Sequence, residues 1–530
     1  MTATIFQTLI GIVAYLLIMI AIGLWYARRS NSNMDEYFLG NRGLGPWVAA
    51  MSTEASDMSG WLLMGLPGVA YFTGSGEAFW TALGLAIGTW LNWHIVAKRL
   101  RVYSQVADNS ITLPEFFSKR FHDKKHILMT IAAITILVFF SIYVGSQFVT
   151  FGKFFAFVFN AENYYTAMVI FGAVVVLIYT LVGGFMAVCM TDLIQGILMF
   201  CALVVVLVCG FIFSGGFSGV SERLTDFPRF LDILGIATPE LQDKKQVLID
   251  GVPQFGAGAN YSLLNIVSCM AWGLGYFGMP QVLIRFMAIT KASKIRQSKY
   301  IAVIWCLISL FAAVAIGLVG RAYMPSMFTD ASAAENIFIS MTLDFFPPLL
   351  AGVVLSGVLA ASMSSSDSYM ITVSSSLAND LFKPFFKKAS EGAVMWVARI
   401  AIIMVTIFGV MVALSGDNSI FRIVSYAWAG LGAAFGPLVL FALFWKRTTL
   451  PAAVAGMLSG GVVVVVWKNF ISKLSGSEVF VFSDVLAVYE LLPAFLISAL
   501  VIFVVSLCTK APDQTIEKEF DIAVKGDLDF

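Results

Sequence analysis

Long apolar runs alternate with short polar segments along almost the whole chain. Because a helix needs about 20 apolar residues to cross a bilayer, this pattern predicts about thirteen transmembrane helices. The runs begin near residues 5, 44, 78, 127, 164, 190, 261, 299, 346, 394, 420, 450 and 486. The first run has no basic residue before it and has Arg28 and Arg29 after it, the reverse of a secretory signal, so we interpret it as a retained helix.

Two of the predicted helices are interrupted by polar and flexible residues. The second contains Asp57, Ser59, three glycines and Pro67 within residues 55–68, and the seventh contains three glycines and a proline within residues 272–280. Glycine and proline free backbone groups that lipid cannot satisfy, so such segments normally line a cavity. The two segments lie five helices apart and therefore cross in opposite directions. This indicates two inverted repeats, with binding sites at the breaks, as in secondary transporters.

The sequence thus predicts an all-α polytopic membrane protein with two inverted five-helix repeats, one extra N-terminal helix and two extra C-terminal helices. In chain order, the predicted segments are the first helix with the first cytoplasmic loop (1–43), the first repeat (44–215), an extracytoplasmic loop (216–260), the second repeat (261–445), two peripheral helices (446–508) and a cytoplasmic tail (509–530). The tail is short and polar, and we expect it to be flexible.

Charged residues lie between the apolar runs. Basic clusters alternate with loops that have few basic residues, and the longest loop, 214–261, has four Lys or Arg against six Asp or Glu. With an odd number of helices, the positive-inside rule places the N-terminus outside and the C-terminus in the cytoplasm. We therefore expect a multi-pass protein of the plasma (inner) membrane.

The composition argues against several other classes. Hydrophobic residues make up 59% of the 530 residues and charged residues 12%, against about 25% charged in soluble domains. The 33 Lys and Arg nearly balance the 32 Asp and Glu, so no basic excess points to nucleic acid. The chain has no P-loop motif, no CxxC pair and no pair of intramembrane histidines. We expect no enzyme activity, organic cofactor, transition metal or obligate protein partner; the expected partners are a small solute and the lipid bilayer.

Asp57 is the most unusual residue of the first interruption. A carboxylate inside a bilayer costs about 2.5 kcal/mol or more, so it either attracts a cation or caps the second half of a broken helix. These two roles are compatible. Glu54, three residues earlier, lies either in an aqueous cavity or beside a basic residue.

Residues 362–368, Ser-Met-Ser-Ser-Ser-Asp-Ser, form a polar island in the ninth predicted helix. Hydroxyl and carbonyl oxygens suit hard cations such as Na⁺. Ser364 and Ser365 therefore either contribute to an ion site or bond only to carbonyls one turn back in their own helix. Asp367 has no assigned role.

Three further residues have two interpretations each. Asp192, at the start of the sixth predicted helix, is either a solvated residue at the cytoplasmic end or part of an ion exit or second cation site. Trp272 and Tyr276 are either packing and interface anchors or a flat apolar wall for a small solute.

Five motifs resemble the sodium/solute symporter family, and within it the members that carry proline. The resemblance extends from about residue 8 to residue 512, and its motifs are YFLGNRGLGP (37–46), ASDMSGWLLMGLPG (55–68), GGFMAV (183–188) followed by Thr191 and Asp192, WGLGYFG (272–278) and SYAWAGLGAAFGP (425–437). It implies the inverted-repeat fold of leucine-transporter type. It also implies import of L-proline by symport with Na⁺ through alternating access.

The resemblance further implies roles for individual residues. The implied Na⁺ ligands are the backbone carbonyls of Ala55, Met58 and Ala361 and the hydroxyls of Ser364 and Ser365. The residues implied in sodium coupling are Asp57 and Asp192. The residues implied in substrate binding are Ser59, Gly60, Trp61, Tyr143, Trp272, Tyr276 and Pro280. Free N–H groups near Ser59 and Gly60 are expected to meet the carboxylate of the substrate.

The sequence departs from the family pattern at three positions. Met279 stands where many relatives have Gln, Glu54 replaces a small residue, and Ser365 replaces Thr but keeps the hydroxyl. The missing amide at Met279 leaves other cargoes open, namely another amino acid, a betaine-like osmolyte or a carboxylate vitamin. A channel and a membrane sensor are the alternatives from other classes.

Overall fold

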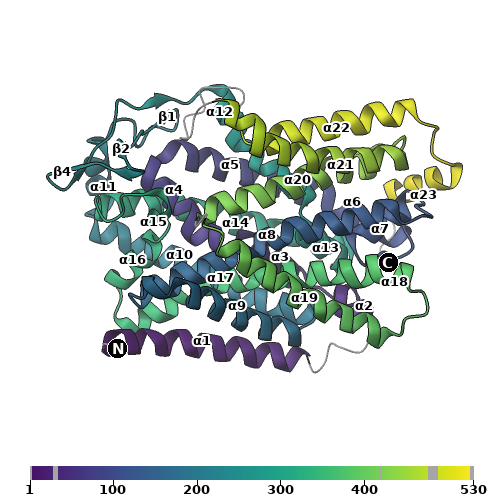
Figure 1. Cartoon of the computed structure of the whole chain (residues 1–530), viewed down its shortest axis with the longest axis horizontal. Helices are drawn as coiled ribbons and strands as arrows, with labels where there is room; N and C mark the ends of the chain where they lie inside the picture. Colours follow the sequence, from purple (N-terminus) through teal and green to yellow (C-terminus); the bar gives the residue numbers. More distant parts are fainter. Residues whose placement is uncertain (1–2, 28–33, 417–418, 476–487, 526–530) are drawn as a thin grey trace.

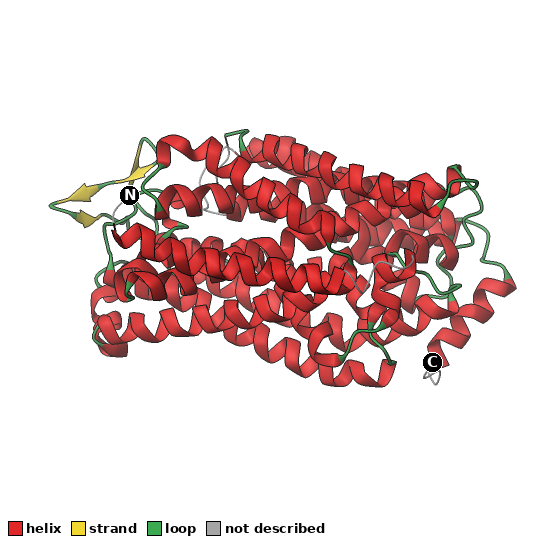
Figure 2. Ribbon diagram, turned by 90° about the horizontal axis from the view of Figure 1, so that it is seen from below, coloured by secondary structure: helices red, strands yellow, loops and turns green. Residues whose placement is uncertain are grey.

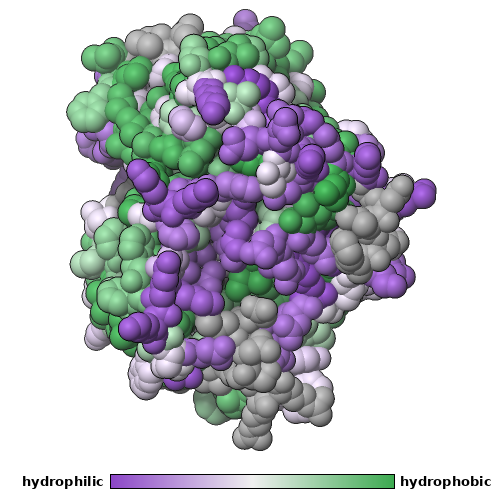
Figure 3. Space-filling model, turned by 90° about the vertical axis from the view of Figure 1, so that its right-hand side faces the viewer, coloured by the Kyte–Doolittle hydropathy of each residue, from purple (hydrophilic) through white to green (hydrophobic). Residues whose placement is uncertain are grey.

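The computed structural model describes residues 3–27, 34–416, 419–475 and 488–525. Long helices pack side by side into an elongated bundle, and three short two-stranded sheets lie at one of its ends (Figures 1 and 2). Large apolar side chains on the long helices, including Leu17, Ile178 and Met411, are exposed. Hydrophilic side chains gather at the opposite end of the bundle (Figure 3). This distribution suits a protein whose flanks face lipid and whose two ends face water.

The first half of the chain forms helices up to residue 225. Their bounds are α1 Ala3–Ala27, α2 Met34–Leu39, η1 Gly40–Arg42, α3 Pro46–Gly60, η2 Trp61–Gly65, α4 Leu66–Thr73, α5 Ser75–Leu91, η3 Asn92–Val96, α6 Ala97–Val106, α7 Leu113–Arg120, α8 Ile127–Val158, η4 Glu162–Tyr164, α9 Tyr165–Val182, α10 Phe185–Phe213 and α11 Gly216–Thr225. Short strands follow in three antiparallel pairs: β1 Gly235–Ile236 with β6 Ala259–Asn260, β2 Leu241–Gln242 with β3 Lys245–Gln246, and β4 Leu248–Ile249 with β5 Val252–Pro253.

The second half continues the bundle. Its helices are α12 Leu263–Met270, η5 Ala271–Gly278, α13 Pro280–Ala288, η6 Ala292–Lys294, α14 Ile295–Tyr323, α15 Ala331–Ala334, α16 Ile337–Phe345, α17 Pro348–Ser375, η7 Ser376–Phe382, α18 Lys383–Phe385, α19 Glu391–Ala413, α20 Ile420–Phe444, α21 Leu450–Val466, η8 Trp467–Ile471, η9 Ser472–Ser475, α22 Leu491–Cys508 and α23 Gln514–Lys525. In space, α3 packs against α10, α13 and α17, while η5 packs against α5 and α20.

The predicted number of membrane helices is not confirmed. Within the described residues, ten helices are long and apolar enough to cross a membrane, or eleven when Leu263–Gly278 and Pro280–Ala288 count as one bent helix. Residues 46–73 and 75–106 are also helical but are not among these helices. Polar residues within both segments lower their mean hydropathy, so hydropathy alone does not identify them as membrane helices.

Both predicted interruptions break their helices. Ser59 in α3 has φ 39° and ψ −174°, which no α-helix contains, and the wider turns of η2 follow. In the second interruption, α12 passes into the tighter 3₁₀ turns of η5, and the chain then bends by 45°. Pro280 begins α13, because a proline at the first helical position gives up an N–H that would have no helical partner anyway.

The C-terminal tail differs from the sequence-based expectation. Residues 514–525 form the amphipathic helix α23, in which Ile516, Phe520 and Ala523 share one face and are buried. The Arg120 guanidinium lies 5.3 Å from the centre of the Phe520 ring. The expectation of flexibility is therefore wrong for this part of the tail. Arg28, Arg29, residues 526–530 and the predicted start of the last span near residue 486 lie outside the described residues.

Candidate functional site

The polar island of α17 meets α3 close to its break. The Ser364 hydroxyl lies 2.8 Å from the carbonyl oxygen of Ala55 and 3.1 Å from that of Ala361, both within hydrogen-bonding distance. Ser364 therefore reaches a carbonyl of α3 as well as one of its own helix, so the interpretation that it bonds only within its own helix is wrong, and its place in an ion site stays a prediction. The neighbouring Ser365 hydroxyl is fully buried and has no hydrogen-bond partner among the described residues. We call Ala55, Ala361, Ser364 and Ser365 the oxygen cluster.

The oxygen cluster is a neutral set of donors that suits a hard cation. A buried hydroxyl without a partner loses the hydrogen bonds that it makes in water, so a bound cation would improve the environment of Ser365. The carbonyl of Met58, in the same turn of α3, accepts a bond from the Trp61 N–H and keeps a second lone pair. A cation held here would connect the first half of the chain to the second.

Asp57 connects the same turn of α3 to η5. The Tyr276 hydroxyl donates to Oδ2 of Asp57 at 2.6 Å, and the Asn92 amide donates to the Tyr276 carbonyl at 2.9 Å. Oδ1 of Asp57 is buried and has no partner among the described residues. Neither oxygen accepts a backbone N–H in this part of the chain, so the interpretation of Asp57 as a helix cap is wrong. Asp57 therefore has one carboxylate oxygen bonded to Tyr276 of η5 and one oxygen without a partner among the described residues.

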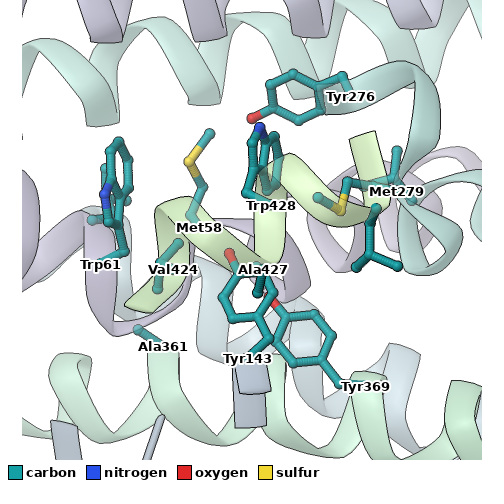
Figure 4. Close-up of a cluster of buried hydrophobic side chains, with 14 of the residues drawn as sticks. Met58, Trp61, Tyr143, Tyr276, Met279, Ala361, Tyr369, Val424, Ala427 and Trp428 are labelled. Carbon is teal, nitrogen blue, oxygen red and sulfur yellow. The ribbon is translucent and has the colours of Figure 1, made fainter. Parts of the chain in front are cut away.

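A small cavity lies beside Asp57. Its other lining residues are Met58, Trp61, Leu85, Tyr143, Trp272, Tyr276, Val424 and Trp428. Figure 4 shows Trp61 and Trp428 on opposite sides of Met58, with Tyr276 next to Trp428. The ring centres of Trp61 and Trp272 are 5.4 Å apart. The cavity has room for about one water molecule, so these walls must separate before an amino acid enters.

The predicted substrate residues fall into two groups. Those that line the cavity are Trp61, Tyr143, Trp272 and Tyr276, whereas Ser59, Gly60 and Pro280 do not line it. Gly60 instead faces α8 and α17, where an added Cβ would lie 2.5 Å from the Thr150 hydroxyl. Its N–H donates to Oε1 of Gln147 at 3.3 Å. The N–H groups expected to be free at this break therefore have partners within the protein, because the Trp61 N–H also reaches the Ser59 hydroxyl, at 3.2 Å.

Trp428, like Leu85 and Val424, lines the cavity but was not predicted from the sequence. Its indole N–H donates to the Trp272 carbonyl at 2.8 Å, and its ring meets the Tyr276 ring edge-on at 5.1 Å between centres. Gly275 passes so close to this indole that an added Cβ would overlap it. Trp428 belongs to the motif 425–437, which supported the family resemblance but was given no role in the site.

A second polar cluster is built from charged groups. The Arg285 guanidinium lies 2.8 Å from Asp192, and it also donates to the Ser52 hydroxyl at 2.5 Å and the Ser368 hydroxyl at 2.7 Å. Ser52 in turn donates to Asp192 at 2.7 Å. Asp192 is 0% exposed, so the interpretation of a solvated residue is wrong. We call Asp192, Arg285, Ser52 and Ser368 the charged cluster; it joins α3, α10, α13 and α17.

Three residues without a settled role are buried nearby. Glu54 accepts a hydrogen bond from the Trp93 indole at 3.3 Å, and its other oxygen has no partner among the described residues. Neither environment expected for Glu54, an aqueous cavity or a basic partner, is present in this part of the chain. Both carboxylate oxygens of Asp367 are buried and similarly unpartnered. Met279 is buried outside the cavity wall, so the missing amide at this position does not alter that wall directly.

Comparisons with known proteins place this arrangement among transporters. The sequence profile of the sodium:solute symporter family matches residues 37–460. The chain is 40% identical to the sodium/proline symporter of Escherichia coli strain K12 over 517 aligned residues. The aligned region covers 97% of this chain and 95% of the relative. It is 37% identical over 519 residues to the sodium/proline symporter of Staphylococcus aureus strain USA300, with the same coverage. Among solved structures, a Na⁺-coupled sialic acid symporter in a substrate-bound outward-open state superposes with a TM-score of 0.73 at 18% identity, covering 96% of this chain and 99% of the other.

Proposed function

Because the chain belongs to the sodium:solute symporter family, we propose that it imports L-proline by symport with Na⁺ through alternating access. It is a multi-pass membrane protein with the inverted-repeat fold of leucine-transporter type, and Na⁺ is its coupling ion. The family consists of transporters, not enzymes. Proline as the cargo is supported by the names of relatives that match nearly the whole chain.

The oxygen cluster is the observation that carries the ion part of this proposal. We assign Na⁺ to the carbonyls of Ala55, Met58 and Ala361 and the hydroxyls of Ser364 and Ser365, because these oxygens are the neutral, hard donors that the ion prefers. The partnerless hydroxyl of Ser365 supports this assignment. We assign sodium coupling to Asp57 and Asp192, and substrate binding to Ser59, Gly60, Trp61, Tyr143, Trp272, Tyr276 and Pro280.

Coupling follows from where these groups lie. Na⁺ between α3 and α17 would hold the repeats 44–215 and 261–445 together and favour one conformation for substrate capture. The bond between Tyr276 and Asp57 ties the cavity wall to the turn that carries two of the assigned carbonyls. Moving one charge through about 100 mV is worth about 2.3 kcal/mol, which sustains a solute gradient of about fiftyfold.

The orientation is part of the proposal. We place the protein in the plasma (inner) membrane with its N-terminus outside and its C-terminus in the cytoplasm. The distribution of basic residues supports this arrangement, because the basic segments that contain α7 and α18 lie at the same end of the bundle as α23 (Figure 1).

Uptake into liposomes that contain only this protein tests the proposal. An inward Na⁺ gradient is expected to drive saturable accumulation of labelled proline, and replacement of Na⁺ by K⁺ is expected to abolish it. Absence of Na⁺ stimulation would contradict the proposed function. Competition with unlabelled amino acids, betaine and carboxylate vitamins checks the cargo, and large single-channel currents would show a channel instead.

A further inference from the structure

One buried oxygen in the cavity wall has no partner. Asp57 is 5% exposed and lines the cavity, and its Oδ1 forms no hydrogen bond among the described residues. The Tyr276 hydroxyl holds the other oxygen, Oδ2, at 2.6 Å. A buried acceptor without a donor is costly, and more so when the group carries a charge. The protein therefore keeps a polar group here that a bound donor would satisfy.

The surroundings of this oxygen suit a positively charged donor. Aromatic rings from four parts of the chain form most of the wall, namely Trp61 of η2, Tyr143 of α8, Trp272 and Tyr276 of η5, and Trp428 of α20. Ring faces attract ammonium groups, and they also pack well against an apolar hydrocarbon ring. Within the part of the chain that the structure describes, no Lys or Arg lines the cavity.

The nearby buried cation does not neutralise Asp57 through a contact. Arg285 makes its hydrogen bonds to Ser52, Asp192, Ser368 and the carbonyl of Gln281. Its guanidinium is thereby committed to the charged cluster. Oδ1 of Asp57 is thus available to a ligand.

We propose that Oδ1 of Asp57 accepts a hydrogen bond from the ammonium group of the substrate. This inference rests on the proposed function, because the ammonium of proline carries N–H donors next to an apolar ring. The chemical class that fits is a small, largely apolar molecule with a protonated amine. The Tyr276 hydroxyl acts as a positioning group, since its bond to Oδ2 keeps the carboxylate from turning away from the cavity.

In this arrangement, Na⁺ and the solute would both bind to the same turn of α3. Ala55 and Met58, whose carbonyls are assigned to Na⁺, flank Asp57 in the same turn of α3. A Na⁺ ion that fixes this turn would fix the acceptor for the ammonium as well. Binding of each would then favour binding of the other, because both select the same arrangement of the turn.

Substrate analogues test this proposal on the unaltered protein. Labelled proline uptake into liposomes at saturating Na⁺ would be challenged with cyclopentanecarboxylate, which lacks the amine, and with pyrrolidine, which lacks the carboxylate. We expect cyclopentanecarboxylate to compete at least about 100-fold more weakly than unlabelled proline, because a site built to bond an N–H strongly rejects an analogue without it. We also expect pyrrolidine to compete better than cyclopentanecarboxylate. The reverse order would overturn the proposal while leaving proline symport intact.

The Asp57→Asn variant separates amine recognition from a role confined to Na⁺. Binding of proline and cyclopentanecarboxylate to the purified variant would be compared at saturating Na⁺. We expect the preference for proline to fall at least tenfold, because the amide oxygen carries no charge. Asp380→Asn, a buried aspartate of η7 that bonds to Thr112 at 2.7 Å, is the matched control and should keep the preference. An unchanged preference in Asp57→Asn, with only a higher Na⁺ requirement, would overturn the proposal.

Discussion

The oxygen cluster and the charged cluster connect the same two helices, α3 and α17, in opposite ways. In the oxygen cluster, Ser364 reaches across to the carbonyl of Ala55, and Ser365 has no partner among the described residues. In the charged cluster, Ser52 of α3 and Ser368 of α17 both bond to the guanidinium of Arg285, which also pairs with Asp192. The oxygen cluster consists of neutral carbonyl and hydroxyl groups, whereas the charged cluster contains a cationic side chain, the guanidinium of Arg285.

This difference shows how a transporter can connect two helices both reversibly, through a bound ion, and permanently, through a buried ion pair. A site that takes up and releases Na⁺ in each cycle needs donors without a fixed charge partner, because a strongly paired site would not exchange. A guanidinium that is buried with its carboxylate stays in place, because separating the pair leaves an uncompensated buried charge. We therefore expect the charged cluster to contribute mainly to stability, beside the coupling role proposed for Asp192, and the oxygen cluster to set the Na⁺ requirement.

The largest effect is expected when the charged cluster is broken. The substitution Arg285→Gln leaves Asp192 buried without a counter-charge, and removal of one partner from a buried ion pair costs about 3–5 kcal/mol. We expect a clear fall in the unfolding temperature of the protein in detergent, measured by intrinsic fluorescence. An unchanged unfolding temperature would show that the pair does not stabilise the fold.

A double variant provides the control for this experiment. Asp192→Asn combined with Arg285→Gln removes both charges, so the unpaired carboxylate disappears. We expect the double variant to be more stable than Arg285→Gln alone, in a double-mutant cycle measured by the same method. If the two losses of stability simply added, the pair would not be coupled, and the comparison between the clusters would fail.

The second largest effect is expected in the oxygen cluster. Ser365→Ala removes one assigned ligand without removing a hydrogen bond found among the described residues. We expect the Na⁺ concentration for half-maximal proline uptake to rise about tenfold, equivalent to about 1.4 kcal/mol, with little change in unfolding temperature. Ser374→Ala is the matched control in the same helix, because among the described residues that hydroxyl bonds only to the Ile371 carbonyl, at 2.8 Å. An unchanged Na⁺ requirement in Ser365→Ala would remove this residue from the ion site.

The two clusters also differ in how far the sequence could predict them. The broken helices were predictable, because glycine, proline and polar residues rarely gather at membrane depth unless the helix is interrupted there. Ser364 and Ser365 could be proposed because they stand in a polar island within an apolar run. The partner of Asp192 could not be found in this way, since Arg285 lies 93 positions further along the chain and only helix packing brings them together. A single arginine inside an apolar segment was nevertheless an available signal.

The remaining differences have similar physical reasons. Trp428 was missed because tryptophan in a membrane helix usually packs or anchors, and only the three-dimensional structure reveals its bond to the Trp272 carbonyl. Helix α23 was missed because a short polar segment becomes helical when its apolar face finds a surface to cover. The number of membrane helices was not confirmed, because residues 46–73 and 75–106 are too polar for a test based on hydropathy.

A smaller effect, on the solute but not on the ion, is expected from Trp428→Phe. Phenylalanine keeps an aromatic wall but loses the hydrogen bond to the Trp272 carbonyl, which is worth about 0.5–1.5 kcal/mol. We expect KM for proline to rise about fivefold, because η5 and its Tyr276 are held less firmly. The Na⁺ requirement at saturating proline should stay within about twofold of the original protein. An equal change in both quantities would mean that Trp428 supports the whole site and not the solute cavity.

The smallest effect is expected from Glu54→Gln, which tests where the oxygen cluster ends. Glu54 precedes Ala55 in the chain, but its side chain accepts a hydrogen bond from the Trp93 indole and forms none with Ser364 or Ser365 among the described residues. Glutamine has the same length, and its carbonyl oxygen can accept the same bond. We therefore expect the Na⁺ requirement for proline uptake to change by less than about twofold, since no assigned ligand is lost. A tenfold rise, similar to that expected for Ser365→Ala, would place a carboxylate in the ion site, and the contrast between a neutral site and a charged cluster would no longer hold.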